Sequence, residues 1–491
     1  MSKPRKLVLT VIDGMKPTML QRAIGAGCAP ALKAIHDRGT YVSDCVAAFP
    51  SVTPVCAGTI ATGRLQDEHE IPSMNWYSRE EERYVEYGSS FQASRRFGLN
   101  RQLVDTIFNM NEHHLAADTP TIFETLDDAG VRSACTTYLI FRGRHPHEVS
   151  KDWALTRVAS SLFKRSVMGP AELFYADIFA SRKTGCWSRM GIPGMRDQHA
   201  GCVGSYLVEH DLFDFLLLSL PDNDAHSHKH GPHAQIASIA AADAELWRIM
   251  EAGGGAEAFL AEHAMIVMAD HSHTHIEQVI DFTGPFGDWK VLAPSGANAN
   301  SAELALCPAQ RSAMVYLLLD SRSALPRIVA TARAIEGVDV VMWRGEDGRA
   351  HIGGERGELT FAPADGASSS KVVADERGVR WEIDGELDTL LADVRDGVLR
   401  CEHYPDALRR VWSALTCRTS GDVLLSAEPS YEFPDWGKRA HLRGGSHGSL
   451  HRVDSLGALL FCGIDCPPER LDGPWSIGDV APLVLAHFGA G

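Results

Sequence analysis

The sequence predicts an α/β protein with a mostly parallel central sheet and a smaller α+β lobe inserted into it. Residues 215–220 (FLLLSL) carry no charge, which is typical of a parallel strand buried on both faces. Residues 6–12 and 264–268 have the same character, and helical patterns that end at Gly separate these strands. From about residue 286, this succession of apolar strands and helices gives way to shorter, Gly-rich segments in which apolar and polar residues alternate. This change indicates the inserted lobe.

Length and charge narrow the function classes. A chain of 491 residues is long for one core, so we expect one large domain with an insertion, or two to three domains. The net charge of −16 argues against a general nucleic-acid binder, which needs a basic face. The negative net charge remains compatible with an anionic substrate, because a bound metal ion makes the local electrostatic potential positive. No apolar run approaches the roughly 20 residues of a membrane-spanning helix.

The cysteine pattern favours free thiols. The chain has eleven cysteines, an odd number, without any CxxC pair. The first residues lead directly into a strand, and their apolar segment is too short for a secretory signal. We therefore predict a reduced, cytoplasmic protein, with its oligomeric state left open.

Two features of the first third are candidate site positions. The strand at 6–12 stops at Asp13-Gly14, where the carboxylate belongs either to a site or to a turn. After a helix at 29–38, residues 49–63 (FPSVTPVCAGTIATG) place Thr53 before Pro54, which predicts an N-cap and the start of a helix. A hydroxyl there lies at the positive end of the helix dipole, where an alkoxide and a phosphate are favoured, or it only caps the helix. Ser51 is a rival hydroxyl.

The middle of the chain adds possible substrate contacts and a metal half-site. The aromatic loop at 69–77 either lines a pocket or packs internally, and Arg142 follows a strand predicted at 132–139 as a possible anion contact. The strand at 215–220 ends in Pro221, and a loop rich in Asp and His follows it. One Asp and one His from this loop have the chemistry of a metal half-site. The candidates are Asp222, Asp224, His226, His228 and His230.

The remaining elements return to the same sheet edge. A helix at 234–251 and a strand at 264–268 lead to Asp270-His271, the third strand end that carries an Asp. The lobe at 286–440 is predicted to contain a strand at 313–319, a helix at 324–335, a strand at 338–343 and a loop tip at 367–370. Residues 441–448 (HLRGGSHG) contain His447 between glycines. A strand at 456–461 and a helix at 477–487 close the chain.

In order and local context these motifs resemble the alkaline phosphatase superfamily, and within it the type I phosphodiesterase/nucleotide pyrophosphatase family. The matching pieces are the strand-Asp-Gly start, the FPSVT segment, the Ala-Asp-His element, the final GSHG and the segment HEIPSMNWY. The resemblance implies a three-layer alkaline-phosphatase-like core at 1–285 and 441–491. It also implies that the lobe at 286–440 is a substrate cap.

The resemblance further implies a dinuclear zinc site, with Mn²⁺ or another divalent metal as a substitute. One ion would be held by Asp13, Asp270, His271 and Thr53, with Thr53 as the nucleophile. The other would be held by a His447-containing set. The family pattern, aligned without gaps at Gly231-Pro232, adds Asp224 and His228 to that set, and we favour this alignment. Alignment at Pro221 gives Asp222 and His226 instead, with two extra residues before Gly231.

The implied activity is hydrolysis of phosphodiester or nucleotide pyrophosphate bonds through a phospho-threonine. The same set of metal ligands would also serve a phosphonate hydrolase like phosphonoacetate hydrolase, a phosphomonoesterase or a phosphotransferase. A binding protein without catalytic activity is the alternative outside the enzymes. The partner would be a small phosphate- or phosphonate-containing molecule. The chain departs from the family at Cys56, where an Asn is usual, and at Ser227, where a Gly is usual. Cys56, Asn75 and Arg142 are the candidate substrate contacts, and His273 or His275 is expected to orient a ligand.

Overall fold

An eight-stranded, mostly parallel sheet forms the centre of this computed structural model, which describes residues 4–149, 166–318, 322–364, 372–471 and 473–491. β1 pairs in parallel with β10 and β11, whereas β26 and β9 are antiparallel to their neighbours. The strands in spatial order are β2 (Thr40–Val46), β26 (Leu456–Cys462), β11 (His263–Met268), β1 (Lys6–Ile12), β10 (Phe215–Leu220), β5 (Ser133–Thr136), β8 (Glu172–Tyr175) and β9 (Phe179–Ala180).

Helices cover both faces of this sheet. Side chains alternate along each strand, so that both faces carry apolar side chains. On β1, Leu7, Leu9 and Val11 join one apolar cluster, and Val8 and Ile12 join the other. The first face packs against α3 (Thr53–Thr62), α7 (Ile122–Asp128) and α17 (Val480–Phe488). The second packs against α1 (Pro17–Gly25), α2 (Pro30–His36), α9 (Arg196–Glu209), α11 (Ile236–Ala252) and α12 (Ala256–Glu262). This is the expected three-layer α/β arrangement.

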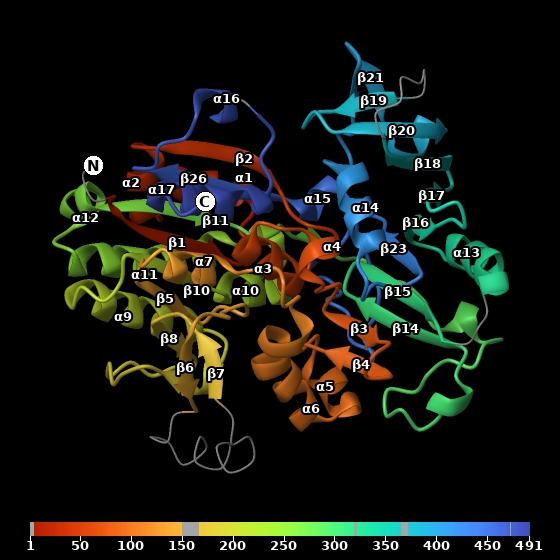
Figure 1. The fold of residues 1–491 in the computed structure, drawn as a ribbon, viewed down its shortest axis with the longest axis horizontal. Helices are drawn as coiled ribbons and strands as arrows, with labels where there is room; N and C mark the ends of the chain where they lie inside the picture. Colours follow the sequence, from red (N-terminus) through yellow and green to blue (C-terminus); the bar gives the residue numbers. More distant parts are fainter. Residues whose placement is uncertain (1–3, 150–165, 319–321, 365–371, 472) are drawn as a thin grey trace.

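A ten-stranded sheet occupies the right-hand part of Figure 1, and all of its strands come from residues 304–427. Helix α13 (Leu325–Arg333) packs on one face, and the other face belongs to the same apolar cluster as the central sheet. The two sheets therefore share one core. In spatial order the strands are β14 (Leu304–Ala309), β15 (Ser312–Leu317), β23 (Val423–Ala427), β16 (Val338–Arg344), β17 (Ala350–Gly354), β18 (Gly357–Pro363), β20 (Arg380–Gly385), β19 (Val372–Asp375), β22 (Val398–Arg400) and β21 (Asp393–Arg395).

Shorter elements fill the space around the two sheets. The expected loop tip at 367–370 lies outside the described residues. The additional strands are paired as β3 (Asn75–Ser78) with β4 (Arg83–Glu86), β6 (His145–Glu148) with β7 (Ser166–Gly169), β12 (Thr274–His275) with β25 (Gly445–Ser446), and β13 (Gln278–Val279) with β24 (Tyr431–Glu432). The additional helices are α4 (Gln66–His69), α5 (Phe91–Phe97), α6 (Leu99–Val104), a π-helix (Asp105–His114), α10 (Asp222–His230), α14 (Ala407–Thr416), α15 (Arg452–Ser455) and α16 (Pro468–Leu471).

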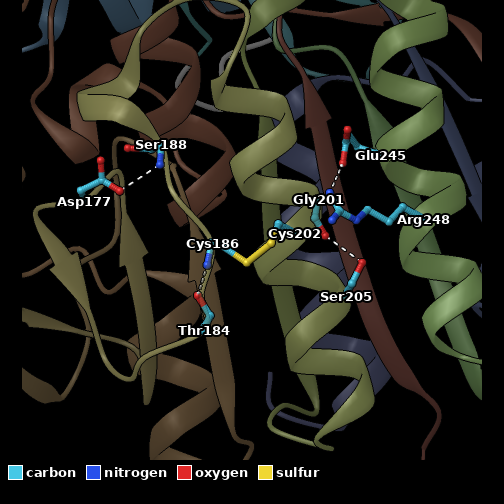
Figure 2. Close-up of a disulfide and its surroundings, with 9 residues drawn as sticks. All are labelled: Asp177, Thr184, Cys186, Ser188, Gly201, Cys202, Ser205, Glu245 and Arg248. Atoms are coloured by element: carbon cyan, nitrogen blue, oxygen red, sulfur yellow. Dashed lines mark hydrogen bonds and ion pairs between the residues drawn. A yellow bond between two sulfur atoms is a disulfide. The ribbon is translucent and has the colours of Figure 1, made fainter.

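The prediction that every cysteine is free is wrong for one pair. Cys186 and Cys202 form a disulfide between the segment after β9 and helix α9 (Figure 2). Their Cα atoms lie 5.8 Å apart, within the range that a disulfide spans. The segment after β9 and helix α9 meet only in the folded chain, so the spacing of 16 residues in the sequence could not indicate the pair. Among the described residues, no helix is both long and apolar enough to cross a membrane.

Candidate metal and catalytic site

Three neighbouring strands of the central sheet deliver their carboxylates to one edge. In the parallel register, Ile12 of β1 lies opposite Leu220 of β10, and Val11 lies opposite Met268 of β11. The residues that follow these strands therefore emerge together, at the carboxyl edge where α/β sheets bind ligands. This register brings Asp13, Asp224 and Asp270 to the same place.

The first half of the site gathers around the imidazole of His271. Its Nε2 lies 3.4 Å from Oδ1 of Asp13 and 3.4 Å from Oδ2 of Asp270. The hydroxyl of Thr53 lies 3.3 Å from the same nitrogen. Because Nδ1 of His271 donates to the carbonyl of Ser272 at 3.1 Å, Nε2 carries the lone pair and accepts from Thr53. The four expected residues of this half are thus assembled.

The second half gathers around the carboxylate of Asp224. Its Oδ1 lies 3.2 Å from Nε2 of His228 and 3.5 Å from Nε2 of His447. Both histidines donate through Nδ1 to a backbone carbonyl at 2.8 Å, His228 to Gly445 and His447 to Ser51. These bonds use Nδ1 of each ring and direct Nε2 toward the carboxylate, the orientation found in histidines that bind metals.

The two halves touch. The rings of His271 and His447 stack with their centroids 3.6 Å apart. In addition, potential ligand atoms of Asp13, Asp224 and His271 lie within 4.8 Å of one another, as do those of Asp224, His228, His273 and His447. Asp224 belongs to both groups, so the site is one continuous cluster that could hold metal.

The stretch after β10 is a helix, α10, rather than the expected loop. Its spacing of four residues places Asp224 and His228 on one face, toward the cluster. Asp222 instead accepts hydrogen bonds from the backbone N–H groups of Arg196 and Asp197 at the start of α9. His226 contacts the carbonyl of Ala234 through Nε2. The geometry therefore supports the Asp224/His228 register over Asp222/His226.

The nucleophile segment also differs in detail from the prediction. Thr53 is the first residue of α3 and not its N-cap, a position that Val52 occupies without a side-chain hydrogen bond. The Thr53 hydroxyl is therefore not used for capping. The rival hydroxyl of Ser51 is buried, donates to the carbonyl of Ser449 and accepts from Gly448 N–H. Of the two hydroxyls, the one on Thr53 faces the cluster.

The electrostatics of the cluster suit a cation. Burial, and then the carboxylates of Asp270 and Asp224, raise the pKa of Asp13 well above its usual value. Burial lowers the pKa of His271 to about 4, so this ring is neutral and does not offset the carboxylates at neutral pH. Within the described part of the chain, Oδ1 of Asp13 and Nε2 of His447 are buried without a hydrogen-bond partner. Crowded carboxylates and unpartnered ligand atoms of this kind are stabilised by a bound metal ion.

The three candidate substrate contacts have different surroundings. Cys56 is fully buried on α3, and burial raises the pKa of its thiol well above the usual value. Asn75 is buried on β3, where its amide donates to the carbonyl of Val85 and its Oδ1 has no partner. Arg142 binds Glu124 and the carbonyls of residues 115, 116 and 119. Its guanidinium is therefore used in the fold, which gives no support to an anion contact.

His273 is a member of the cluster that the metal-ligand prediction did not include. It is fully buried, and its Nε2 lies 2.9 Å from Oδ1 of Asp224. Burial lowers its pKa well below the usual value. The alternation of His271 and His273 after an extended strand was the available signal, because residues two apart in extended backbone face the same side.

A family model describes the type I phosphodiesterase/nucleotide pyrophosphatases, and it matches residues 7–450. The chain belongs to this family. Its members are phosphoric ester hydrolases. The match includes the strand ends that carry Asp13, Asp224 and Asp270, and it confirms the family that the sequence motifs indicated.

Solved structures of this family and its relatives share the fold. Murine ectonucleotide pyrophosphatase/phosphodiesterase 5, inactive and in complex with AMP, is 11% identical over 99% of this chain and 95% of that chain, with a TM-score of 0.57. The human protein of that name is 12% identical, with the same coverage and a TM-score of 0.56. Phosphonoacetate hydrolase from Sinorhizobium meliloti 1021, in complex with phosphonoformate, is 19% identical over 99% and 96%, with a TM-score of 0.55. No curated protein sequence matches the chain.

Proposed function

We propose that this phosphodiesterase-family protein cleaves phosphodiester or nucleotide pyrophosphate bonds with Thr53 as the nucleophile. The observation that carries the proposal is the Thr53 hydroxyl at the first turn of α3, 3.3 Å from Nε2 of His271 and beside the buried carboxylates. The helix N-terminus favours a bound phosphoryl group. The hydroxyl of Ser51 is instead hydrogen-bonded to the backbone of Ser449 and Gly448.

Two zinc ions are the proposed cofactor. Asp13, Asp270, His271 and Thr53 would hold one ion, and the set around Asp224 would hold the other. Oxygen and nitrogen ligands without thiolates suit catalytic zinc, and Mn²⁺ is compatible with the same donors. When bound, such ions supply the positive charge that lowers the pKa of a hydroxyl and stabilises charge on a phosphoryl group. The unpartnered buried atoms of Asp13 and His447 support this assignment.

The proposed reaction has two steps. The oxygen of Thr53 forms a bond to phosphorus, the bond from phosphorus to the leaving oxygen breaks, and the leaving group takes up the proton that the Thr53 hydroxyl loses. A water oxygen then forms a bond to phosphorus, the bond from phosphorus to the Thr53 oxygen breaks, and a proton of that water restores the Thr53 hydroxyl. The rigid start of α3 holds the threonine in place through both steps, because its first turns pack in the core.

Phosphonate hydrolysis is the second candidate. Cys56 occupies the position where an Asn is usual after the nucleophile, and its buried thiol is a weak hydrogen-bond donor. A relative with the same fold is in complex with phosphonoformate. In either reaction the inserted lobe would act as the substrate cap. In support, the backbone N–H of Arg311, at the turn between β14 and β15, donates to the carbonyl of His447 at 3.0 Å.

A substrate screen combined with metal analysis tests the proposal. We expect purified protein to bind about two zinc ions and to hydrolyse bis-p-nitrophenyl phosphate and thymidine 5′-p-nitrophenyl phosphate faster than p-nitrophenyl phosphate. Higher activity on phosphonoacetate than on the diesters would favour the second candidate. Asp224→Ala should lose one zinc ion, whereas its matched control Asp222→Ala should keep both. A wild-type protein without zinc or hydrolytic activity contradicts the proposal.

A further inference from the structure

His273 lies in a slot that two glycines leave open. A Cβ atom added to Gly14 would lie 2.5 Å from Nε2 of His273, and one added to Gly445 would lie 3.2 Å from Nδ1. Gly14 also has a positive φ of 65°, which a side chain would strain. The backbone after β1 and the backbone of β25 therefore approach the ring from two sides and fix its position.

The hydrogen bonds of His273 differ from those of the other three histidines in the cluster. His228, His271 and His447 each donate through Nδ1 to a backbone carbonyl, which leaves the Nε2 lone pair free for a metal. Nδ1 of His273 is buried and has no hydrogen-bond partner among the described residues. Its Nε2 lies 2.9 Å from a carboxylate oxygen, which is an acceptor only.

These contacts assign the proton to Nε2 of His273. If Nε2 were a metal ligand, the proton of the neutral ring would have to lie on Nδ1. That buried N–H would have no acceptor, which costs folding free energy. With the proton on Nε2, the ring donates to Asp224, and only a lone pair of Nδ1 stays unsatisfied. His273 thus has the right distance for the cluster but the wrong tautomer for a ligand.

We propose that His273 is a positioning residue, which orients the carboxylate of Asp224 through an Nε2–H···Oδ1 hydrogen bond. A carboxylate has about four lone-pair sites, so this bond leaves others for a metal ion. Asp224 lies within reach of both halves of the cluster, so its orientation sets the relative placement of the two halves. The inference rests on the proposed metal-dependent function and adds a residue to it.

Zinc affinity of the full-length protein, measured by chelator competition, tests this role in two variants. His273→Leu removes the donor and should weaken the binding of one zinc ion by about 10–100-fold, the usual loss for such supporting hydrogen bonds. His273→Gln places an amide N–H at the same distance along the side chain and should restore most of the affinity. If His273 were a ligand, Gln and Leu would be equally harmful, and X-ray absorption of the wild-type zinc form would count one more imidazole.

The control is His230→Leu, which changes an exposed histidine at the end of α10 and should leave zinc affinity unchanged. Thermal unfolding of the metal-free variants shows whether each is folded. Equal zinc affinity of wild type and a folded His273→Leu overturns the inference while the proposed function stands. Failure of the wild type to bind zinc overturns both.

Discussion

The central sheet and the ten-stranded sheet contribute to the site in different ways. The central sheet supplies the carboxylates directly, at the ends of β1, β10 and β11. The ten-stranded sheet supplies none of the proposed ligands, but two buried arginines from that region reach the segments that carry them. Arg311 contacts the segment after His447, and Arg410 of α14 donates to the carbonyl of Ala48, shortly before Thr53.

Arg311, at the turn between β14 and β15, connects the region of the ten-stranded sheet to the loop after His447. Its guanidinium is fully buried and donates to Oδ1 of Asp454 at 2.5 Å and to Ser449 Oγ at 3.2 Å. Asp454 in turn accepts from the backbone N–H of Ser449, two residues after His447. The central sheet therefore carries most of the proposed metal ligands, and the region of the ten-stranded sheet contacts the loop that carries His447. Three predictions test this division.

The largest effect is expected from replacing Thr53, on helix α3, which packs against the central sheet. Thr53→Ala should lower kcat by several orders of magnitude, roughly 10³–10⁶-fold, because loss of a covalent nucleophile generally does. Thr53→Ser keeps the oxygen and should retain substantial activity. Steady-state kinetics and zinc analysis measure both, and zinc content should stay near that of the wild type. A Thr53→Ala protein with near wild-type kcat would make a water molecule the better candidate nucleophile.

The next largest effect is expected from replacing Arg311, at the turn between β14 and β15 of the ten-stranded sheet. Arg311→Met leaves Asp454 as a buried charge without its partner, which should cost about 3–5 kcal/mol of unfolding free energy in urea titrations. The double variant Arg311→Met/Asp454→Leu should recover part of this loss, because no charge then remains unpaired. Arg395→Met, which breaks an exposed pair with Asp393, is the control and should have no measurable effect. Equal stability of Arg311→Met and the control would show that the lobe is not anchored through this pair.

The smallest of the three effects is expected from the disulfide at the edge of the central sheet, which lies outside the proposed metal cluster. Cys186→Ala/Cys202→Ala opens a loop with a sequence separation of 16. This should destabilise the protein by about 3 kcal/mol, the value typical of loops of this size. Zinc content and kcat should not change under native conditions. A loss of zinc in this variant would mean that the central sheet transmits strain from its edge to the site.

The sequence by itself determined the elements whose signals are local. The uncharged run of β10 has the predicted bounds, and the Asp residues at strand ends have the predicted placement, because a parallel register brings such ends together in any α/β sheet. The family followed from the order of these same motifs. The place of Thr53 before Pro54 predicted the start of a helix, and the structure has Thr53 as the first helical residue rather than as the N-cap.

Only the tertiary structure decided the features that depend on distant segments. Asp222, the first residue of helix α10, is bound by the start of α9, whereas Asp224 lies on the helix face toward the cluster. The disulfide and the Arg311–Asp454 pair join residues that come together only by packing. His273 is assigned its tautomer by a carboxylate 49 positions away, on another element. A sequence pattern records spacing along one segment, whereas these contacts are fixed by how separate segments fold together.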